Sequence, residues 1–309
     1  MEQENAMTLS SPRLGFIGLG NMGGRVARRL LDAGYPLGVH SRHPDSIRAL
    51  IDLGAQFHAS PRQLARNSDV VLTMLPDDPA VESVVLGADG VLSGIAAGAT
   101  IIDLSSVHPS TSRSIAAASE LRSVSVLDAP VSGSTPQAEA GTLVIFVGGN
   151  RDIYEGCRPI FDVISNSRFF MGPSGAGATM KLVVNDLLGV GMQAVAEAVT
   201  LGQRAGLDQD LLIDVLQQTA VLTPGQKAKL QNVRTGAYPT QFALRLMWKD
   251  FGNVMRLAQE LQVPLPATAA AHQIATIEQR RGIDEDFSAV IRTMAELAGL
   301  SRDKVLKVR

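Results

Sequence analysis

The chain has 309 residues, of which 45% are hydrophobic and 19% are charged, and its formal net charge is -2. This length and composition suffice for a buried core in each of two domains. The near-balanced charge and a pI of about 6.2 lack the basic field that nucleic-acid or anionic membrane partners require. A single cysteine, Cys157, excludes a disulfide framework and a multi-cysteine zinc site. We therefore expect a globular protein that binds a small molecule and no metal.

Residues 1–12 are expected to form a flexible N-terminal segment. Residues 1–6 carry acids where a signal or transit peptide requires bases, and no apolar stretch follows before Arg13. The most apolar helical stretch, residues 187–201, is interrupted by two polar residues and is too short to span a bilayer. These features predict a cytoplasmic protein without a membrane partner.

A glycine-rich loop follows the first apolar run. Residues 14–17 predict a buried strand, residues 25–31 have the pattern of a helix, and between them stands Gly18-Leu19-Gly20-Asn21-Met22-Gly23. A strand that ends in G-x-G-x-x-G and leads into a helix brings backbone N–H groups and the positive end of the helix dipole to a pyrophosphate. We predict a dinucleotide-binding loop, with cofactor contacts from Gly18, Leu19, Gly20, Asn21 and Met22.

Strands and helices alternate through the rest of the first half. Further buried strands are predicted at residues 37–40, 70–75, 100–104, 124–128 and 143–147. Helical patterns occur at residues 46–53, 61–66, 79–85 and 110–122. Continuous apolar strands suit a parallel sheet that is covered on both faces, and their alternation with helices is typical of a doubly wound α/β fold. The sequence predicts a Rossmann-type dinucleotide-binding domain over residues 13–172.

The residues after the second predicted strand indicate which dinucleotide is bound. NAD enzymes usually place an Asp or Glu here, on the ribose 2′-OH, but this chain has Ser41-Arg42-His43. A guanidinium offers a planar fork of donors to a phosphate; a solvated loop charge is the alternative interpretation of Arg42. We predict that NADP(H) is preferred over NAD(H). Ser41 and Arg42 are assigned to the cofactor site, together with Met74 and Leu75.

The apolar period changes beyond about residue 172. Residues 178–205, 209–219, 240–261 and 267–280 carry apolar residues at helical spacing, with no strand-like run between them. We predict an all-α C-terminal domain for substrate binding and dimerisation over residues 173–309, which begins with a long interdomain helix capped by Ser174. Long apolar helices require covering surface, so a homodimer or homotetramer is expected.

The long helix carries the best candidate for acid–base chemistry. Reduction of a carbonyl requires a general acid within hydrogen-bond reach of its oxygen, and none of the five histidines has a spacing that suggests a proton relay. Gly177, Lys181, Asn185 and Gly189 lie four residues apart and share one helical face. A lysine within an apolar helix is costly to bury without a function, although its ammonium could also reach solvent. We predict that Lys181 and Asn185 project together between glycines that leave room for a nicotinamide ring.

Four motifs together resemble the β-hydroxyacid dehydrogenase family. They are the glycine loop, the segment Asp128-Ala129-Pro130-Val131-Ser132-Gly133, the Gly-x-Gly-x-x-x-Lys-x-x-x-Asn helix, and the pair Lys249-Asp250. They occur in the family's order over about residues 13–300. The family includes 3-hydroxyisobutyrate dehydrogenases, tartronate semialdehyde reductases and glyoxylate/succinic semialdehyde reductases.

The resemblance implies a role for each matching residue in catalysis. Lys181 passes the proton to and from the substrate oxygen, and Asn185 orients the substrate. Ser132 and Gly133 anchor the substrate carboxylate.

The same resemblance implies further contacts. Ser106 stands where relatives usually have a threonine beside the nicotinamide. Lys249 matches a lysine near the cofactor, and Asp250 is its partner in the substrate site. Phe242, eight residues before Asp250 and therefore expected on the same helical face, matches an aromatic residue beside the substrate.

Two short departures bear on the substrate. Many 3-hydroxyisobutyrate dehydrogenases have Ser-Gly-Gly and Asn-Asn where this chain has Ser-Gly-Ser134 and Asn-Asp186. The Ser-Gly-Ser form resembles the glyoxylate/succinic semialdehyde reductase branch, which implies NADPH-dependent reduction of a small carboxylate-bearing aldehyde to the hydroxyacid. A 3-hydroxyisobutyrate or tartronate semialdehyde (2-hydroxy-3-oxopropionate) enzyme is the alternative. Lys181 argues against an imine reductase or a non-catalytic dinucleotide-binding protein, because such relatives generally lack it.

Overall fold

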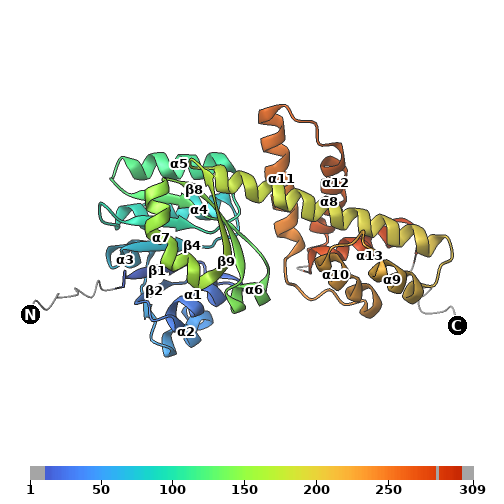
Figure 1. Ribbon diagram of the computed structural model, residues 1–309, viewed down its shortest axis with the longest axis horizontal. Helices are drawn as coiled ribbons and strands as arrows, with labels where there is room; N and C mark the ends of the chain where they lie inside the picture. Colours follow the sequence, from blue (N-terminus) through green and yellow to red (C-terminus); the bar gives the residue numbers. More distant parts are fainter. Residues whose placement is uncertain (1–10, 283–284, 301–309) are drawn as a thin grey trace, which may run out of the picture. The chain divides into compact units, whose positions relative to one another are not determined.

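The computed structural model describes residues 11–282 and 285–300. The chain forms two compact units, which divide between Lys181 and Leu182 (Figure 1). Most of the predicted N-terminal segment, residues 1–10, lies outside the described residues.

The first unit is built on a nine-stranded sheet. The strands are β1 (Leu14–Ile17), β2 (Leu37–His40), β3 (Gln56–Phe57), β4 (Val70–Thr73), β5 (Thr100–Asp103), β6 (Ser125–Asp128), β7 (Val131–Ser132), β8 (Leu143–Gly149) and β9 (Ser165–Gly172). Six of them run parallel in the order β3-β2-β1-β4-β5-β6, which is the strand order of a dinucleotide-binding Rossmann sheet. Beyond β6, strand β8 runs antiparallel to both β6 and β7 and parallel to β9.

Helices cover both faces of this sheet. They are α1 (Gly23–Asp32), η1 (Pro44–Ile47), α2 (Arg48–Asp52), α3 (Pro61–Arg66), α4 (Asp78–Leu86), η2 (Val91–Ser93), α5 (Pro109–Glu120), α6 (Thr135–Ala140) and α7 (Arg151–Ile164). Because successive strand residues point to opposite faces, Leu72 packs in the core beneath α1 and α7, while its neighbour Val71 packs in the core beneath α3, α4 and α5. The first unit is therefore the doubly wound α/β fold that the sequence predicts.

A buried carboxylate at the end of β6 starts the helix α8 (Ala176–Arg204). Asp128 is 2% exposed, and its two carboxylate oxygens accept hydrogen bonds from the N–H groups of Gly175 (2.8 Å) and Ala178 (2.9 Å). The first N–H groups of a helix have no partner within the helix, and an anion beside them is stabilised by the helix dipole. Asp128 thus supplies the cap that was predicted for Ser174.

The two glycines that were expected to leave room for a ring are packed against protein. A Cβ on Gly177 would collide with the carbonyl oxygens of Asp128 and Phe146, and a Cβ on Gly189 would collide with the ring of Phe251. Glycine at these positions therefore allows close packing within each unit, and the prediction of space for the nicotinamide at these glycines is wrong.

The second unit is helical throughout its described residues. Besides most of α8 it contains α9 (Gln209–Gln218), α10 (Pro224–Thr235), α11 (Leu244–Leu261), α12 (Pro266–Arg280), η3 (Phe287–Ala289) and α13 (Val290–Leu297). Its core joins Met192 and Val199 of α8 to Met247 and Phe251 of α11. The second half of the chain is therefore all-α, as predicted.

Helix α8 closely matches the predicted helical stretch 178–205, but its apolar window of 18 residues is longer than the stretch 187–201 considered above. It has 29 residues, and its most apolar window has a mean hydropathy of 1.4 and is 44% buried. By length and composition alone it could cross a membrane, so the expectation of a stretch too short to do so is corrected. Core helices of proteins outside membranes meet the same criterion, so this is weak evidence for a span.

Burial raises the pKa of Asp128 to about 6, although two backbone N–H groups donate to it. A carboxyl whose folded-state pKa is raised stabilises the fold most at low pH, and that contribution is lost as the pH rises from about 4 through 6. Asparagine does not titrate, so we expect the unfolding free energy of Asp128→Asn to decrease less than that of the wild type over this range. The difference is up to about 3 kcal/mol for a shift of two pKa units. Urea unfolding at pH 4 to 7.5 measures the difference, and parallel profiles for the two proteins would contradict it.

Candidate active site

The three glycines of the loop after β1 meet three different environments. Gly18 has a φ of +98°, and a Cβ there would collide with the carbonyl oxygen of Met74. A Cβ on Gly23 would collide with the carbonyl oxygen of Gly18, whereas nothing lies within 4 Å of a Cβ on Gly20. A dinucleotide loop requires a tight turn first, open backbone for the pyrophosphate second, and close helix–strand packing third. The loop meets each requirement in that order, so its residues fit a dinucleotide.

The other predicted cofactor residues of the first unit follow neighbouring strands. Residues 41–42 follow β2, residues 74–75 follow β4, and Ser106 lies three residues beyond β5. The register pairs Ile17 with His40 and with Thr73, and Thr73 with Asp103, so these parallel strands end level with one another. The strand order reverses between β1 and β4, which is where open α/β sheets bind ligands.

The turn after β2 presents a cation and no acid. The Ser41 hydroxyl accepts the N–H of His43 and donates to its carbonyl oxygen, both at 3.1 Å, which closes the turn around Arg42. The Arg42 side chain is exposed. The turn is therefore open to a phosphate group.

The carboxyl ends of β4 and β5 are linked by buried polar groups. Asp103 is 4% exposed, and its Oδ1 accepts the hydroxyl of Thr73 (2.8 Å) and the N–H of Ser105 (3.1 Å). Burial raises the pKa of Asp103, and these hydrogen bonds oppose the rise. The Ser105 hydroxyl in turn accepts the N–H of Leu75 (2.8 Å).

Ser132 and Gly133 lie where β7 ends. Gly133 is exposed with a φ of +131°, and a Cβ there would lie 2.8 Å from the Leu143 side chain. The N–H of Ser134 donates to Oε1 of the Gln137 side chain at 2.9 Å, at the start of α6. The departure at Ser134 thus coincides with the beginning of a helix.

Buried polar side chains of α8 and α11 meet in the second unit. Asn185, 2% exposed, donates from Nδ2 to Oδ2 of Asp250 at 2.6 Å. Asp250 is 1% exposed, and its Oδ1 lies 2.7 Å from Nζ of Lys249. Because an ionised carboxylate only accepts hydrogen bonds, this contact fixes which end of the amide faces Asp250. The Asn185 Oδ1 atom is buried and has no hydrogen-bond partner among the described residues.

Lys181 lies one helical turn before Asn185 on α8 and is half-buried. The structure therefore brings Asn185, Lys249 and Asp250 together within the second unit, and Lys181 stands at the end of the first unit. Asp186, the second departure, accepts the hydroxyl of Thr268 at 2.6 Å. That hydrogen bond joins α8 to α12, which gives Asp186 a packing role.

Phe242 is not on the helix that was expected to carry it. The helix α11 begins at Leu244, because Asp286 accepts the N–H groups of Gln241 (3.2 Å) and Phe242 (3.1 Å) and holds them outside the helix. The Phe242 ring packs edge-on against Phe287, with centroids 5.7 Å apart. The helical-face argument for placing Phe242 beside Asp250 is therefore wrong.

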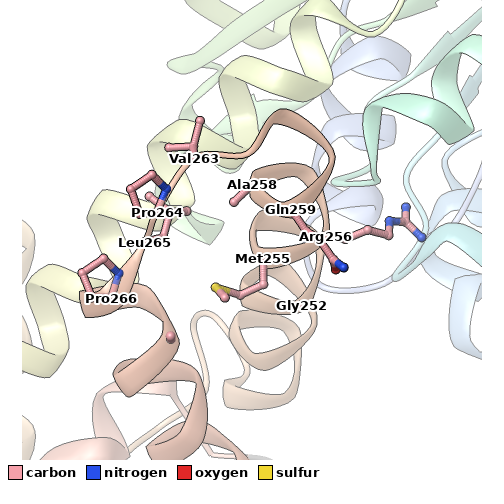
Figure 2. Close-up of a pocket in the computed structure, with 10 residues that line it drawn as sticks. Gly252, Met255, Arg256, Ala258, Gln259, Val263, Pro264, Leu265 and Pro266 are labelled. Carbon is pink, nitrogen blue, oxygen red and sulfur yellow. The ribbon is translucent and has the colours of Figure 1, made fainter.

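A groove of about 770 Å³ lies along α11 and the turn that follows it. Figure 2 shows it lined by Met255 and Ala258 of α11, by residues 263–265 of the turn and by Pro266 at the start of α12, with the Arg256 side chain directed away from the two prolines. None of its lining residues is a predicted site residue. No group of three or more His, Cys, Asp or Glu residues in the described part of the chain could hold a metal ion.

Two family models match the chain in succession. Residues 13–172 match the NAD binding domain of 6-phosphogluconate dehydrogenase, and residues 175–294 match the NAD-binding domain of NADP-dependent 3-hydroxyisobutyrate dehydrogenase. The chain belongs to the β-hydroxyacid dehydrogenase family, in its 3-hydroxyisobutyrate dehydrogenase-like group.

Relatives of this β-hydroxyacid dehydrogenase span almost the whole chain. It is 36% identical to 2-(hydroxymethyl)glutarate dehydrogenase of Eubacterium barkeri, over 94% of this chain and 97% of that one. It is 34% identical to the chloroplastic glyoxylate/succinic semialdehyde reductase 2 of Arabidopsis thaliana, over 93% of this chain and 80% of that one. The crystal structure of 3-hydroxyisobutyrate dehydrogenase from Salmonella typhimurium superposes with a TM-score of 0.83 at 30% identity. The match covers 91% of this chain and 99% of that one. The chain is an NAD(P)-dependent hydroxyacid dehydrogenase that interconverts CH–OH and C=O groups.

Gly20 and Gly23 give a matched pair of substitutions in this β-hydroxyacid dehydrogenase. Gly20→Ala places a methyl group in open space, so we expect wild-type thermal stability and a rise of about tenfold in the NADPH dissociation constant, or 1.4 kcal/mol, as the pyrophosphate is displaced. Gly23→Ala overpacks the loop and is expected to cost about 1–3 kcal/mol of stability. Thermal unfolding and NADPH fluorescence titration measure both effects. Unchanged NADPH affinity in Gly20→Ala would place the pyrophosphate elsewhere.

Proposed function

We propose that this enzyme uses NADPH to reduce a small aldehyde that carries a carboxylate, such as glyoxylate or succinic semialdehyde, and that Lys181 is the general acid–base. The observation that carries the proposal is the arrangement of polar groups on α8. Lys181 is followed one turn later by Asn185, whose amide is buried and fixed by Asp250.

The NADPH-binding residues in this proposal are residues 18–22, 41–42, 74–75 and 106, together with Lys249. When bound, the dinucleotide supplies the hydride. The exposed Arg42 with no acid beside it supports NADPH over NADH, because a guanidinium pairs with the 2′-phosphate through charge-assisted hydrogen bonds. The NADP-dependent family that matches residues 175–294 agrees with this preference.

Ser132 and Gly133 bind the substrate carboxylate. The Ser132 hydroxyl and the exposed backbone at Gly133 offer neutral donors to an anion, and the positive φ of Gly133 sets the direction of that backbone. On the family resemblance alone, the Phe242 ring, which packs against Phe287, is also placed beside the substrate. Fixing the carboxylate leaves the carbonyl carbon in one position relative to the hydride donor, which removes much of the entropic cost of reaction.

Lys181 donates a proton to the carbonyl oxygen as that oxygen gains negative charge, and the resulting amine is reprotonated from solvent. The same group takes the proton from the hydroxyl in the oxidative direction. The buried Oδ1 of Asn185, which has no hydrogen-bond partner among the described residues, accepts from the hydroxyl of the hydroxyacid and so orients it. Oδ2 of Asp250 accepts from Asn185, and its Oδ1 pairs with the Lys249 ammonium, so Asp250 acts by orienting Asn185.

A 3-hydroxyisobutyrate or tartronate semialdehyde enzyme is the second candidate, because relatives with hydroxyacid dehydrogenase names match over nearly the full chain. A kinetic panel with NADPH separates the candidates by kcat/KM. It comprises glyoxylate, succinic semialdehyde, methylmalonate semialdehyde and tartronate semialdehyde. The highest kcat/KM with methylmalonate semialdehyde or tartronate semialdehyde would favour the second candidate. Activity with none of the four aldehydes would refute the proposal.

Self-association into a homodimer or homotetramer is part of the same proposal. Leu187 and Leu201 of α8 are each 72% exposed, and Leu211 of α9 is 62% exposed. A second copy that covers these side chains would bury apolar surface that is otherwise in contact with water.

Lys181→Ala is expected to lower kcat by roughly 10²–10⁴-fold, because the transferred proton loses its donor, while NADPH affinity changes little. Lys181→Arg is the matched control for charge. It keeps a cation, but a guanidinium does not release its proton near neutral pH, so this variant should be as impaired as Lys181→Ala. Steady-state kinetics and NADPH titration measure these effects, and turnover near that of the wild type in either variant would refute the catalytic role.

Arg42→Ala is expected to raise KM for NADPH by roughly 10- to 150-fold, since a hydrogen bond to a charged group contributes about 1.5–3 kcal/mol, and to leave KM for NADH nearly unchanged. Arg48→Ala is the matched control, because Arg48 is an exposed arginine of the same unit that pairs with Asp52 at 3.0 Å. Equal effects of Arg42→Ala on the two coenzymes, or a wild-type preference for NADH, would contradict the assignment.

A further inference from the structure

Four residues form a chain of hydrogen bonds beyond the carboxyl ends of β4 and β5, which we term the Ser105 brace. Thr73 donates to Asp103 at 2.8 Å, Asp103 accepts the Ser105 N–H at 3.1 Å, and the Ser105 hydroxyl accepts the Leu75 N–H at 2.8 Å. Thr73, Asp103 and Ser105 are each at most 4% exposed. Bonds in such surroundings are protected from competition by water, and a lost partner leaves a buried polar group unsatisfied.

The brace continues where the sheet ladder stops. The Met74 N–H donates to the carbonyl oxygen of Ile17 at 2.9 Å, and the Leu104 N–H donates to that of Thr73 at 2.8 Å. These are the last steps of the ladder between neighbouring strands. The next N–H along the chain after Met74, that of Leu75, is held by a side chain, the Ser105 hydroxyl. Ser105 therefore fixes the direction in which the chain leaves β4.

The segment held in this way packs against the glycine loop. A Cβ on Gly18 would collide with the carbonyl oxygen of Met74 and lie 3.2 Å from the Leu75 side chain. With no slack between the two loops, a shift of Leu75 displaces the turn at Gly18. The position of the first turn of the dinucleotide loop thus depends on a hydroxyl that is itself outside that loop.

We propose that Ser105 is a positioning residue for the dinucleotide: through Leu75 it holds the β4 loop against Gly18 and so keeps the glycine loop in its binding geometry. Of the two adjacent serines, the buried Ser105 supports the site, while the half-buried Ser106 is the one assigned to the cofactor. The inference rests on dinucleotide binding alone and is independent of the substrate, of Lys181 and of the coenzyme preference.

The test compares two serine substitutions in the full-length protein. Ser105→Ala removes the acceptor of the Leu75 N–H. Ser119→Ala makes the same chemical change at a serine of α5 that is fully buried and whose hydroxyl has no hydrogen-bond partner among the described residues. Dissociation constants for NADPH and NADH are measured by fluorescence titration, beside thermal unfolding. We expect Ser105→Ala to raise both constants roughly three- to tenfold, the worth of one hydrogen bond, and Ser119→Ala to leave them within about twofold.

A second variant covers the case in which Ser105→Ala does not fold. Thr73→Val keeps the β-branched shape but removes the hydroxyl that donates to Asp103, and it should raise the same constants by a smaller factor. Wild-type affinity in a folded Ser105→Ala or, failing that, in Thr73→Val would overturn the proposal, as would an equal loss in Ser119→Ala. In those outcomes the wild type still binds NADPH and the proposed function stands, whereas failure of the wild type to bind either dinucleotide would refute both.

Discussion

The contact between the Asp128 carboxylate and the start of α8 is the interaction on which the rest of the structure depends. It links the last parallel strand of the sheet to the helix that carries Lys181 and Asn185. The close packing of Gly177 against backbone oxygens leaves no freedom in how the first turn sits. Because helix geometry is regular, fixing this turn also fixes the position of Lys181 within the first unit. A buried carboxylate with a raised pKa is the energetic cost of this anchoring.

The edge of the sheet that faces the proposed dinucleotide is rigid for a different reason. Close backbone packing restricts its loops in addition to hydrogen bonds. Gly18 and Gly23 lie where a Cβ would collide with backbone atoms. Gly20 keeps open space in front of the loop. Ser105, in the loop after β5, then holds the N–H of Leu75, which the sheet ladder no longer binds. The binding edge is thus assembled from residues that the sequence places far apart.

The second unit organises its buried polar groups around carboxylates. Asp250 engages Asn185 and Lys249, and Asp286 engages Lys229 (2.7 Å) together with the backbone that carries Phe242. A buried carboxylate is tolerated only when its oxygens are paired, so each of these acids fixes several groups at once. Asn185 and Phe242, which are proposed to contact the substrate, are therefore positioned by Asp250 and Asp286, which are not proposed to contact it.

Sequence alone determined the fold class, the family and the principal elements, because long apolar runs and helical periodicity are local signals. It missed the two-residue strands β3 and β7 and the half-exposed β9, which form by pairing with neighbouring strands. It also gave no range for the helices α6, α7, α10 and α13. It identified the glycine loop and the Lys181–Asn185 spacing, but it gave the wrong purpose to Gly177 and Gly189 and the wrong element to Phe242. Those outcomes, like the roles of Asp128 and Ser105, were decided by tertiary structure, because they depend on which atoms distant segments bring within contact.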